Sequence, residues 1–160
     1  VMKRCPQHTF LLLTKRPERA KALTETMLHF YYPRLKYPLT SLFPHVWLGV
    51  TIESVENLGR AEVALQTGFA HKFVSLEPLL SLVRIGQYLF STENRGRFEW
   101  VIVGGETGPG ARPMKSEWVR DIRDECVKRG VPFFFKKWGA GNNSRLLDGR
   151  EWNEIPEAMR

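Results

Sequence analysis

Charged side chains stand at the ends of five short apolar runs in the sequence. The runs are TFLLLT (9–14), VWLGVTI (46–52), KFVSL (72–76), WVIVGG (100–105) and VPFFFK (131–136). The residues at their ends are, in chain order, Lys15 and Arg16, Glu53, Glu77, Glu106, and Lys136 and Lys137, with Trp138 next. A carboxylate beside a cation keeps its charge, so a set of mixed sign suits a zwitterionic or phosphorylated ligand. The sequence therefore predicts a charged ligand-binding rim, although the first solvated residue of an ordinary loop is often charged too.

The loop after the fourth run is rich in glycine and carries a carboxylate and a guanidinium. Gly104 and Gly105 allow the backbone to approach a ligand closely, and two further glycines of GGETGPGARP (104–113) permit positive φ angles. Exposed amides of such a loop can bind an anion, with Arg112 as a forked donor. The spacing matches neither a phosphate-binding P-loop nor a dinucleotide fingerprint. The alternative is a structural turn in which Glu106 pairs with Arg112.

The runs and the segments between them predict an α/β fold. Strands that are apolar at consecutive positions are buried on both faces, as in a parallel sheet. Helical patterns lie between them at about 30 residues per strand–helix unit, which is typical of right-handed βαβ construction. We expect a partial (β/α) barrel or an open parallel sheet of about five strands flanked by helices. The carboxyl ends of such strands share one edge, where ligands bind.

Three helices are predicted from their start signals, inward residues and stop signals. Their members, in chain order, are Pro17 with Leu23, Met27 and Phe30; Ser54 with Leu58, Ala61 and Leu65, ended by Gly68; and Ser116 with Val119, Ile122 and Cys126, ended by Gly130. The stretch 139–160 has no such pattern, and we expect an irregular tail or a hairpin at its Asp-Gly pair.

The bulk composition is that of one globular α/β domain over residues 1–160. Hydrophobic residues make up 42% and charged residues 26%, and the apolar runs are too short to cross a bilayer. No secretion signal opens the sequence, so we expect a cytoplasmic protein. The two cysteines and four histidines have no metal-ligand spacing, and we expect no metal site.

The net charge of +7 makes binding to a polyanion an alternative function. The segment FYYPRLKYP (30–38) interleaves aromatic rings with cations, as surfaces that bind single-stranded nucleic acid do. Its candidate contacts are Tyr31, Tyr32, Arg34 and Lys36. The other interpretation of this segment is a loop that packs its rings over one end of the sheet.

Five blocks of the chain resemble a known family. They are FLLLTKRPER, VWLGVTIES, KFVSLEPLL, WVIVGGETGPGARPM and VPFFFKKWG, and in this order they resemble the three-cysteine-motif phage protein family, a phage- and bacteria-associated family of unknown function. The similarity extends from about residue 9 to residue 156. It implies a partial barrel related to radical S-adenosylmethionine enzymes, with a cysteine cluster upstream of these blocks that suits an iron–sulfur centre.

This chain has only Cys5 and Cys126, which are isolated, whereas an iron–sulfur centre needs several thiolates. We therefore expect the C-terminal portion of a longer family barrel, without a cofactor of its own and inactive alone; the alternative is a natural short form without the cofactor. In the full-length protein the resemblance implies S-adenosylmethionine at the rim together with an iron–sulfur cluster. No catalytic residue is assigned.

Two further expectations complete the sequence-based picture. A hydrolase without a cofactor, with Glu77 or Glu106 as general base, is the weakest alternative, because no nucleophile accompanies these carboxylates. The run TFLLLT is expected at an unpaired sheet edge, where apolar strands invite pairing. That edge predicts self-association of the chain.

Overall fold

A five-stranded parallel sheet organises the molecule. The structure is a computed structural model that describes residues 1–31, 43–92 and 96–160. The strands lie in chain order across the sheet, and they are β1 (Phe10–Thr14), β2 (Val46–Thr51), β3 (His71–Leu76), β4 (Trp100–Val103) and β5 (Phe133–Phe135). The predicted α/β class is confirmed in its open form, since the sheet does not close into a barrel within the described residues.

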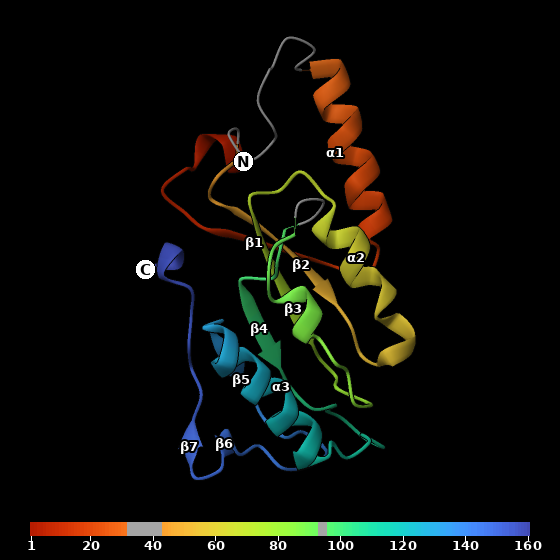
Figure 1. Cartoon of the computed structure of the whole chain (residues 1–160), viewed down its shortest axis with the longest axis vertical. Helices are drawn as coiled ribbons and strands as arrows, with labels where there is room; N and C mark the ends of the chain where they lie inside the picture. The colour runs from red at the N-terminus through yellow and green to blue at the C-terminus, as the bar shows by residue number, and fades with distance from the viewer. Residues whose placement is uncertain (32–42, 93–95) are drawn as a thin grey trace.

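The α-helices gather on one face of this sheet. They are α1 (Pro17–Tyr31), α2 (Gly59–Leu65) and α3 (Ser116–Arg129), and short 3₁₀ helices include η1 (Met2–Arg4), η3 (Val55–Asn57), η4 (Gly86–Tyr88) and η5 (Glu157–Met159). Right-handed crossovers between strands in chain order must all lie on the same side. Figure 1 shows this arrangement, with α1, α2, η4 and α3 on one side of the strands. The opposite side, on which the described residues form no α-helix, is called the open face below.

The main hydrophobic core lies between the sheet and the helices. Val74 and Val101 in the central strands are fully buried, and so are Ala61 of α2 and Val119 of α3, in one continuous cluster. Cys126 of α3 belongs to the same cluster. The core thus fixes the strands from one side and leaves the side chains of the open face for another role.

Helix α3 follows its sequence prediction closely. It begins at Ser116, buries Val119, Ile122 and Cys126, and ends at Gly130, whose φ of +62° is the left-handed conformation of a helix stop. The prediction that Ser116 caps the helix is wrong by one position, because Lys115 is the N-cap and Ser116 is the first helical residue.

The segment after Ser54 forms less helix than the pattern predicts. Ser54 precedes η3 rather than an α-helix, and its hydroxyl makes no capping hydrogen bond. α2 starts later and ends before Gly68, with Gln66 as its C-cap. The predicted inward residues Ala61 and Leu65 are buried as expected.

Helix α1 buries a different face from the predicted one. It begins at the expected proline, Pro17, which is buried together with Thr24. The prediction that Leu23 faces inward is wrong, because this side chain is 55% exposed. α1 packs along α2, and this contact turns Leu23 outward. The side chains of Met27 and Phe30 lie outside the described part of the chain.

Strand β1 is half exposed, unlike its neighbours. β2 is buried at all six positions, as the apolar pattern predicts. In β1 the same prediction is wrong, because Leu11 and Leu13 are 46% and 54% exposed. Both side chains project onto the open face at the edge of the sheet, where no described element covers them.

The C-terminal segment protects the other edge of the sheet. A small hairpin, β6 (Leu146–Leu147) with β7 (Arg150–Glu151), turns at Asp148 and Gly149, which have φ values of +53° and +80°. The predicted Asp-Gly turn is thus confirmed. The chain then runs antiparallel to β5, where the Phe135 amide donates to the Trp152 carbonyl at 2.8 Å.

Candidate functional site

The open face brings two of the predicted rim residues, Glu77 and Lys136, together with a set of apolar residues. Successive strand residues point to opposite faces, so counting back in twos from Glu77 reaches Ser75 and Phe73. The strand register aligns Ser75 with Ile102, and Ile102 with Phe134. One band of side chains therefore crosses the sheet below the ends of the strands.

This band lines a hollow of about 450 Å³, which is called the open-face hollow. Its lining combines apolar side chains with three charged ones and consists of Leu11, Leu13, Phe73, Ser75, Glu77, Trp100, Ile102, Phe134, Lys136 and Arg145. Concave sites of this size, mainly apolar with few polar groups, are typical binding sites for small ligands.

The C-terminal segment closes the end of the hollow that lies toward the amino ends of the strands. Trp47, Phe73 and Trp100 form a buried cluster there, and Met159 of η5 packs against it. The Trp100 indole N–H donates to the carbonyl of Glu154 at 2.9 Å. The hollow is therefore closed toward the amino ends of the strands, and its charged groups Glu77 and Lys136 stand at their carboxyl ends.

Glu77 and Lys136 form an ion pair at the mouth of the hollow. The Lys136 Nζ lies 2.9 Å from Glu77 Oε1, and the two side chains are 53% and 25% exposed. Gly104 allows this position of the carboxylate, because a Cβ at residue 104 would lie 3.1 Å from the Glu77 carboxyl carbon. Two of the predicted rim residues thus meet across β3, β4 and β5.

The loops after β4 and β5 are joined backbone to backbone. The Gly105 amide donates to the Lys137 carbonyl at 3.0 Å, and the Ala140 amide donates to the Glu106 carbonyl at 2.7 Å. A Cβ on Gly105 would overlap the carbonyl of Trp138. The close approach expected at Gly105 is therefore made to the chain's own backbone, and it fixes where Lys136 enters the site.

Glu53 is held at the ends of β1 and β2 by two cations. Lys15 forms an ion pair with its Oε1, and Arg60 Nη1 lies 2.7 Å from its Oε2. Burial opposes ionisation of Glu53, but hydrogen bonds and the charges of Lys15 and Arg60 together lower its pKa. The Glu53 charge is thus satisfied by its own neighbours, and this cluster does not line the open-face hollow.

Glu106 and Arg112 are bound to each other outside the hollow. The guanidinium donates through Nε and Nη2 to the two carboxylate oxygens at 2.8 and 2.7 Å, and the Arg112 amide adds a third bond of 2.8 Å. These hydrogen bonds lower the pKa of Glu106 to about 2. The loop has its predicted positive φ angles, +103° at Gly108 and +73° at Gly110. This geometry matches the structural turn that the sequence left open.

The remaining predicted residues lie apart from the hollow. Arg16 is exposed after β1, and Lys137 is half-buried between the joined loops. Of the nucleic-acid candidates, Tyr32, Arg34 and Lys36 lie outside the described residues, and the side chain of Tyr31 does too. Their role stays a prediction.

Two cations that the sequence reasoning missed belong to these clusters. Arg60 lies in the first turn of α2, seven residues after Glu53, and helical geometry brings it back to the strand end. Arg145 precedes the Asp-Gly hairpin and lines the hollow. No local signal marks Arg145, since its position depends on the fold of the whole tail.

The cysteines do not fit an iron–sulfur centre. Cys126 is packed in the helix-side core, where burial raises the pKa of its thiol to about 12. Cys5 stands half-buried after η1. Among the described residues no group of three or more His, Cys, Asp or Glu side chains is placed to hold a metal ion, and no reaction step is assigned to a metal in this chain.

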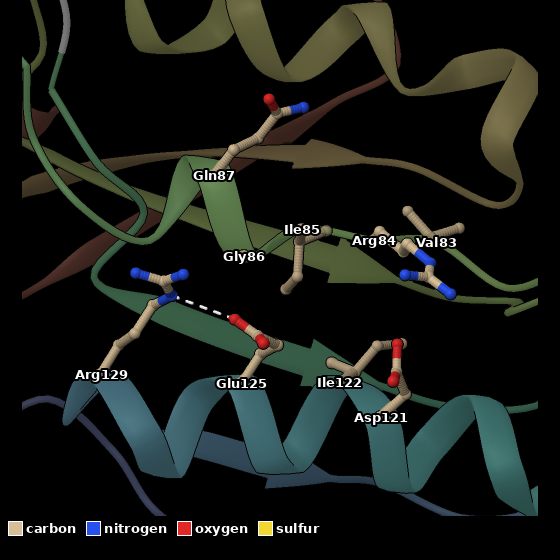
Figure 2. A pocket seen from close by; sticks show the side chains of 9 residues that line it. All are labelled: Val83, Arg84, Ile85, Gly86, Gln87, Asp121, Ile122, Glu125 and Arg129. Carbon is tan, nitrogen blue, oxygen red and sulfur yellow. Dashed lines mark hydrogen bonds and ion pairs between the residues drawn. The ribbon is translucent and has the colours of Figure 1, made fainter.

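A second hollow of about 310 Å³ lies on the helix side, between η4 and α3. Figure 2 shows Glu125 and Arg129 of α3 turned toward each other at its edge, opposite Gly86, and Arg129 Nε donates to Glu125 at 3.1 Å. A Cβ on Gly86 would overlap this carboxylate. Glu125 and Arg129 pair with each other, and none of the predicted rim residues lines this hollow, so we do not take it as the functional site.

The fold and the site define an open-sheet α/β protein with a candidate small-ligand hollow on the open face of its sheet. The chain belongs to the family described as protein of unknown function (DUF5131), whose model matches residues 1–156. Neither the curated proteins nor the solved structures contain a match to the chain. In the described parts of the chain, no helix is both long enough and apolar enough to span a membrane.

Proposed function

We propose that the open-face hollow binds a small zwitterionic nucleoside, with S-adenosylmethionine as the leading candidate. In this proposal the chain is part of a phage-associated, radical S-adenosylmethionine-like protein, as its sequence blocks imply. The observation that carries the proposal is the Glu77–Lys136 pair at the mouth of an apolar, aromatic-lined hollow. Catalysis requires a cofactor that the cysteines of this chain do not fit, so the proposed role is ligand binding.

The charged pair matches the two ends of an amino-acid group. An ion pair as exposed as Glu77–Lys136 contributes little net free energy, because water screens it. A ligand ammonium can therefore replace Lys136 at the carboxylate, while the ligand carboxylate binds the freed lysine. The exchange keeps the ammonium and carboxylate of the ligand, Glu77 and Lys136 each partnered, which is the condition for removing these charged groups from water.

The aromatic part of the hollow, away from Glu77 and Lys136, suits the nucleobase of such a ligand. Trp100 and Phe134 lie edge to face, with ring centres 6.1 Å apart, and Ile102, two residues after Trp100 on β4, is the register partner of Phe134 on β5. Flat aromatic groups pack well against such surfaces. A nucleobase on these rings with an amino-acid group at Glu77 and Lys136 would use both parts of the hollow.

Calorimetric titration with S-adenosylmethionine tests the proposal. We expect saturable binding to the unmodified chain and at least tenfold weaker binding to Glu77→Gln and to Lys136→Met. Glu106→Gln is the matched control, because it makes the same carboxylate-to-amide change in an ion pair outside the hollow. Circular dichroism checks that every variant is folded.

Two outcomes would contradict the proposal. Absence of saturable binding by the folded chain would remove S-adenosylmethionine as its ligand. Equal weakening in Glu77→Gln and in Glu106→Gln would place the ligand away from the hollow or show a general loss of structure.

A further inference from the structure

The hollow contains a third charged residue, Arg145, which comes from the tail rather than from the strand ends. Together with Lys136 and Glu77 it gives the lining two cations and one carboxylate. Lys136 is matched by Glu77. Arg145 forms no ion pair with any described residue; it contacts the amide oxygen of Asn153 and the ring of Phe134. The hollow therefore has one cation in excess.

The backbone holds Arg145 in place from both sides. The Trp138 amide donates to the carbonyl of Ser144 at 3.2 Å, and the Trp138 indole N–H donates to the carbonyl of Leu146 at 2.9 Å. Residue 145 is thus fixed between two hydrogen bonds from one tryptophan. Trp138 itself belongs to the joined loops that carry Lys136. The same loops therefore position both Lys136 and Arg145.

The side chain of Arg145 is also fixed. Its Nη2 donates to Asn153 Oδ1 at 2.7 Å, and Asn153 in turn donates through Nδ2 to Glu151 at 2.6 Å. The guanidinium carbon lies 5.7 Å from the centre of the Phe134 ring, within the hollow. A neutral amide orients the guanidinium without cancelling its charge, and the remaining N–H groups suit a carboxylate or phosphate.

We propose that Arg145 selects ligands with an anionic group, by binding that group through the free N–H donors of its guanidinium. The ligand class is an aromatic or nucleoside compound with a carboxylate, or a phosphate in its place. Lys136 then supports the same anion, and Glu77 is left for a ligand ammonium. This inference rests on the proposed function for the nucleoside part, while the preference for an anion follows from the charge of the lining alone.

Two pairs of probes separate the inference from the proposed function. The first pair is S-adenosylmethionine and its decarboxylated form, which keeps the ammonium but lacks the carboxylate. The second pair is 3-phenylpropionate and phenethylamine, an aromatic acid and an aromatic amine without a nucleoside. Calorimetry on the folded chain gives the affinities, and the Arg145 Nε–H signal in nitrogen-15 NMR reports contact with the guanidinium.

We expect Arg145→Gln to weaken binding of S-adenosylmethionine and 3-phenylpropionate at least tenfold, while affinity for the decarboxylated probe changes less than twofold. Arg150→Gln is the matched control, because Arg150 stacks on Trp152 at 3.5 Å and does not line the hollow. Arg145→Lys should recover part of the loss, since it restores the charge but not the fork.

The results with these probes distinguish failure of the anion selection from failure of the proposed nucleoside ligand. Binding of the aromatic acid in preference to the amine, without binding of S-adenosylmethionine, would keep the anion selection and remove the proposed nucleoside ligand. If Arg145→Gln weakens binding of both probes of a pair equally, or weakens binding of neither, Arg145 does not select for the anionic group. Failure of all four probes to bind would remove both proposals.

Discussion

At the scale of single residues, the three carboxylates that follow β2, β3 and β4 differ in how they are paired. Glu53 and Glu106 are each held by guanidinium groups outside the hollow, whereas Glu77 has one exposed lysine. This difference separates carboxylates that stabilise the loops from the one that is free to exchange its partner. Identical residue types at equivalent strand ends therefore have different roles.

The pair of Glu106 and Arg112 predicts a pH dependence of stability. The pKa of Glu106 falls from 4.5 to about 2 in the folded chain. The contribution of this pair to the free energy of unfolding is therefore complete above the pKa that Glu106 has in the unfolded chain. It is lost as the pH falls from about 4.5 to about 2. We expect Arg112→Gln to lower the free energy of unfolding at pH 6, with a difference from the unmodified chain that shrinks toward pH 2.5.

Urea denaturation at a series of pH values measures this difference. The comparison with the variant is needed because Asp148, whose pKa is also lowered to about 2 by Arg120 and Arg123, titrates in the same range. A difference independent of pH would show that Arg112 stabilises the loop by packing rather than by its charge.

Gly105 is the residue at which the smallest added group has the largest expected effect. A Cβ there would overlap the Trp138 carbonyl, which is backbone and has little freedom to move. We expect Gly105→Ala to lower the free energy of unfolding by about 3 kcal/mol or more. Gly59→Ala is the control, because no atom lies within 4 Å of its added Cβ, and we expect it to raise stability by about 0.5 kcal/mol. Similar unfolding midpoints for the two variants would contradict the joined-loop geometry.

At the scale of elements, the tail is fastened to both α3 and β5. Asp148 of the hairpin binds Arg120 at 2.8 Å and Arg123 at 2.5 Å, and both arginines project from α3. Trp152 lies between Arg123 and Arg150, at 5.4 and 3.5 Å from its ring. The hairpin is thus held at the helix while the residues after it pair with β5.

Loss of the Asp148 charge should loosen the hairpin and leave the sheet intact. Asparagine tolerates the φ of +53° at this position, so Asp148→Asn removes the charge without changing the turn. We expect faster hydrogen exchange at the amides of β6 and β7, with unchanged exchange in β2 and β3. Faster hydrogen exchange throughout the sheet would mean that the ion pairs of Asp148 with Arg120 and Arg123 stabilise the whole fold.

At the scale of the whole molecule, the two edges of the sheet differ. Residues after the hairpin pair with β5, whereas the outer edge of β1 has no strand beside it in the described chain. Leu11 and Leu13 beside that edge are about half exposed. Apolar side chains next to unpaired backbone groups favour pairing with another chain.

Self-association through β1 remains a prediction with a direct test. We expect the average mass from light scattering to rise with concentration, and to stay near that of a monomer for the double variant Leu11→Lys with Leu13→Lys. Leu146→Lys is the control, since Leu146 is 50% exposed on the hairpin instead. A monomeric mass for the unmodified chain at all concentrations would contradict the prediction.

The sequence predicts what depends on near neighbours along the chain. The five strands follow from apolar runs, and the stop of α3 follows from Gly130. The orientation of Leu23 does not follow, because an amphipathic pattern does not say which neighbouring helix will share the burial. Arg145 and the contact between Gly105 and Trp138 join distant segments, and no periodicity marks them.

The hydrogen bond from Trp100 to Glu154 allows intrinsic tryptophan fluorescence to report on the hollow and on the tail. Trp100 lies in the hollow and is tied to the tail through its indole N–H. A ligand stacked nearby would change the intensity of its emission, whereas release of the tail would expose the ring and shift the emission to longer wavelength. Subtracting the emission of Trp100→Phe from that of the unmodified chain would isolate the signal of this one fluorophore, while Trp138 keeps its hydrogen bond to Leu146. Intensity and wavelength would then report occupancy of the hollow and docking of the tail as separate signals.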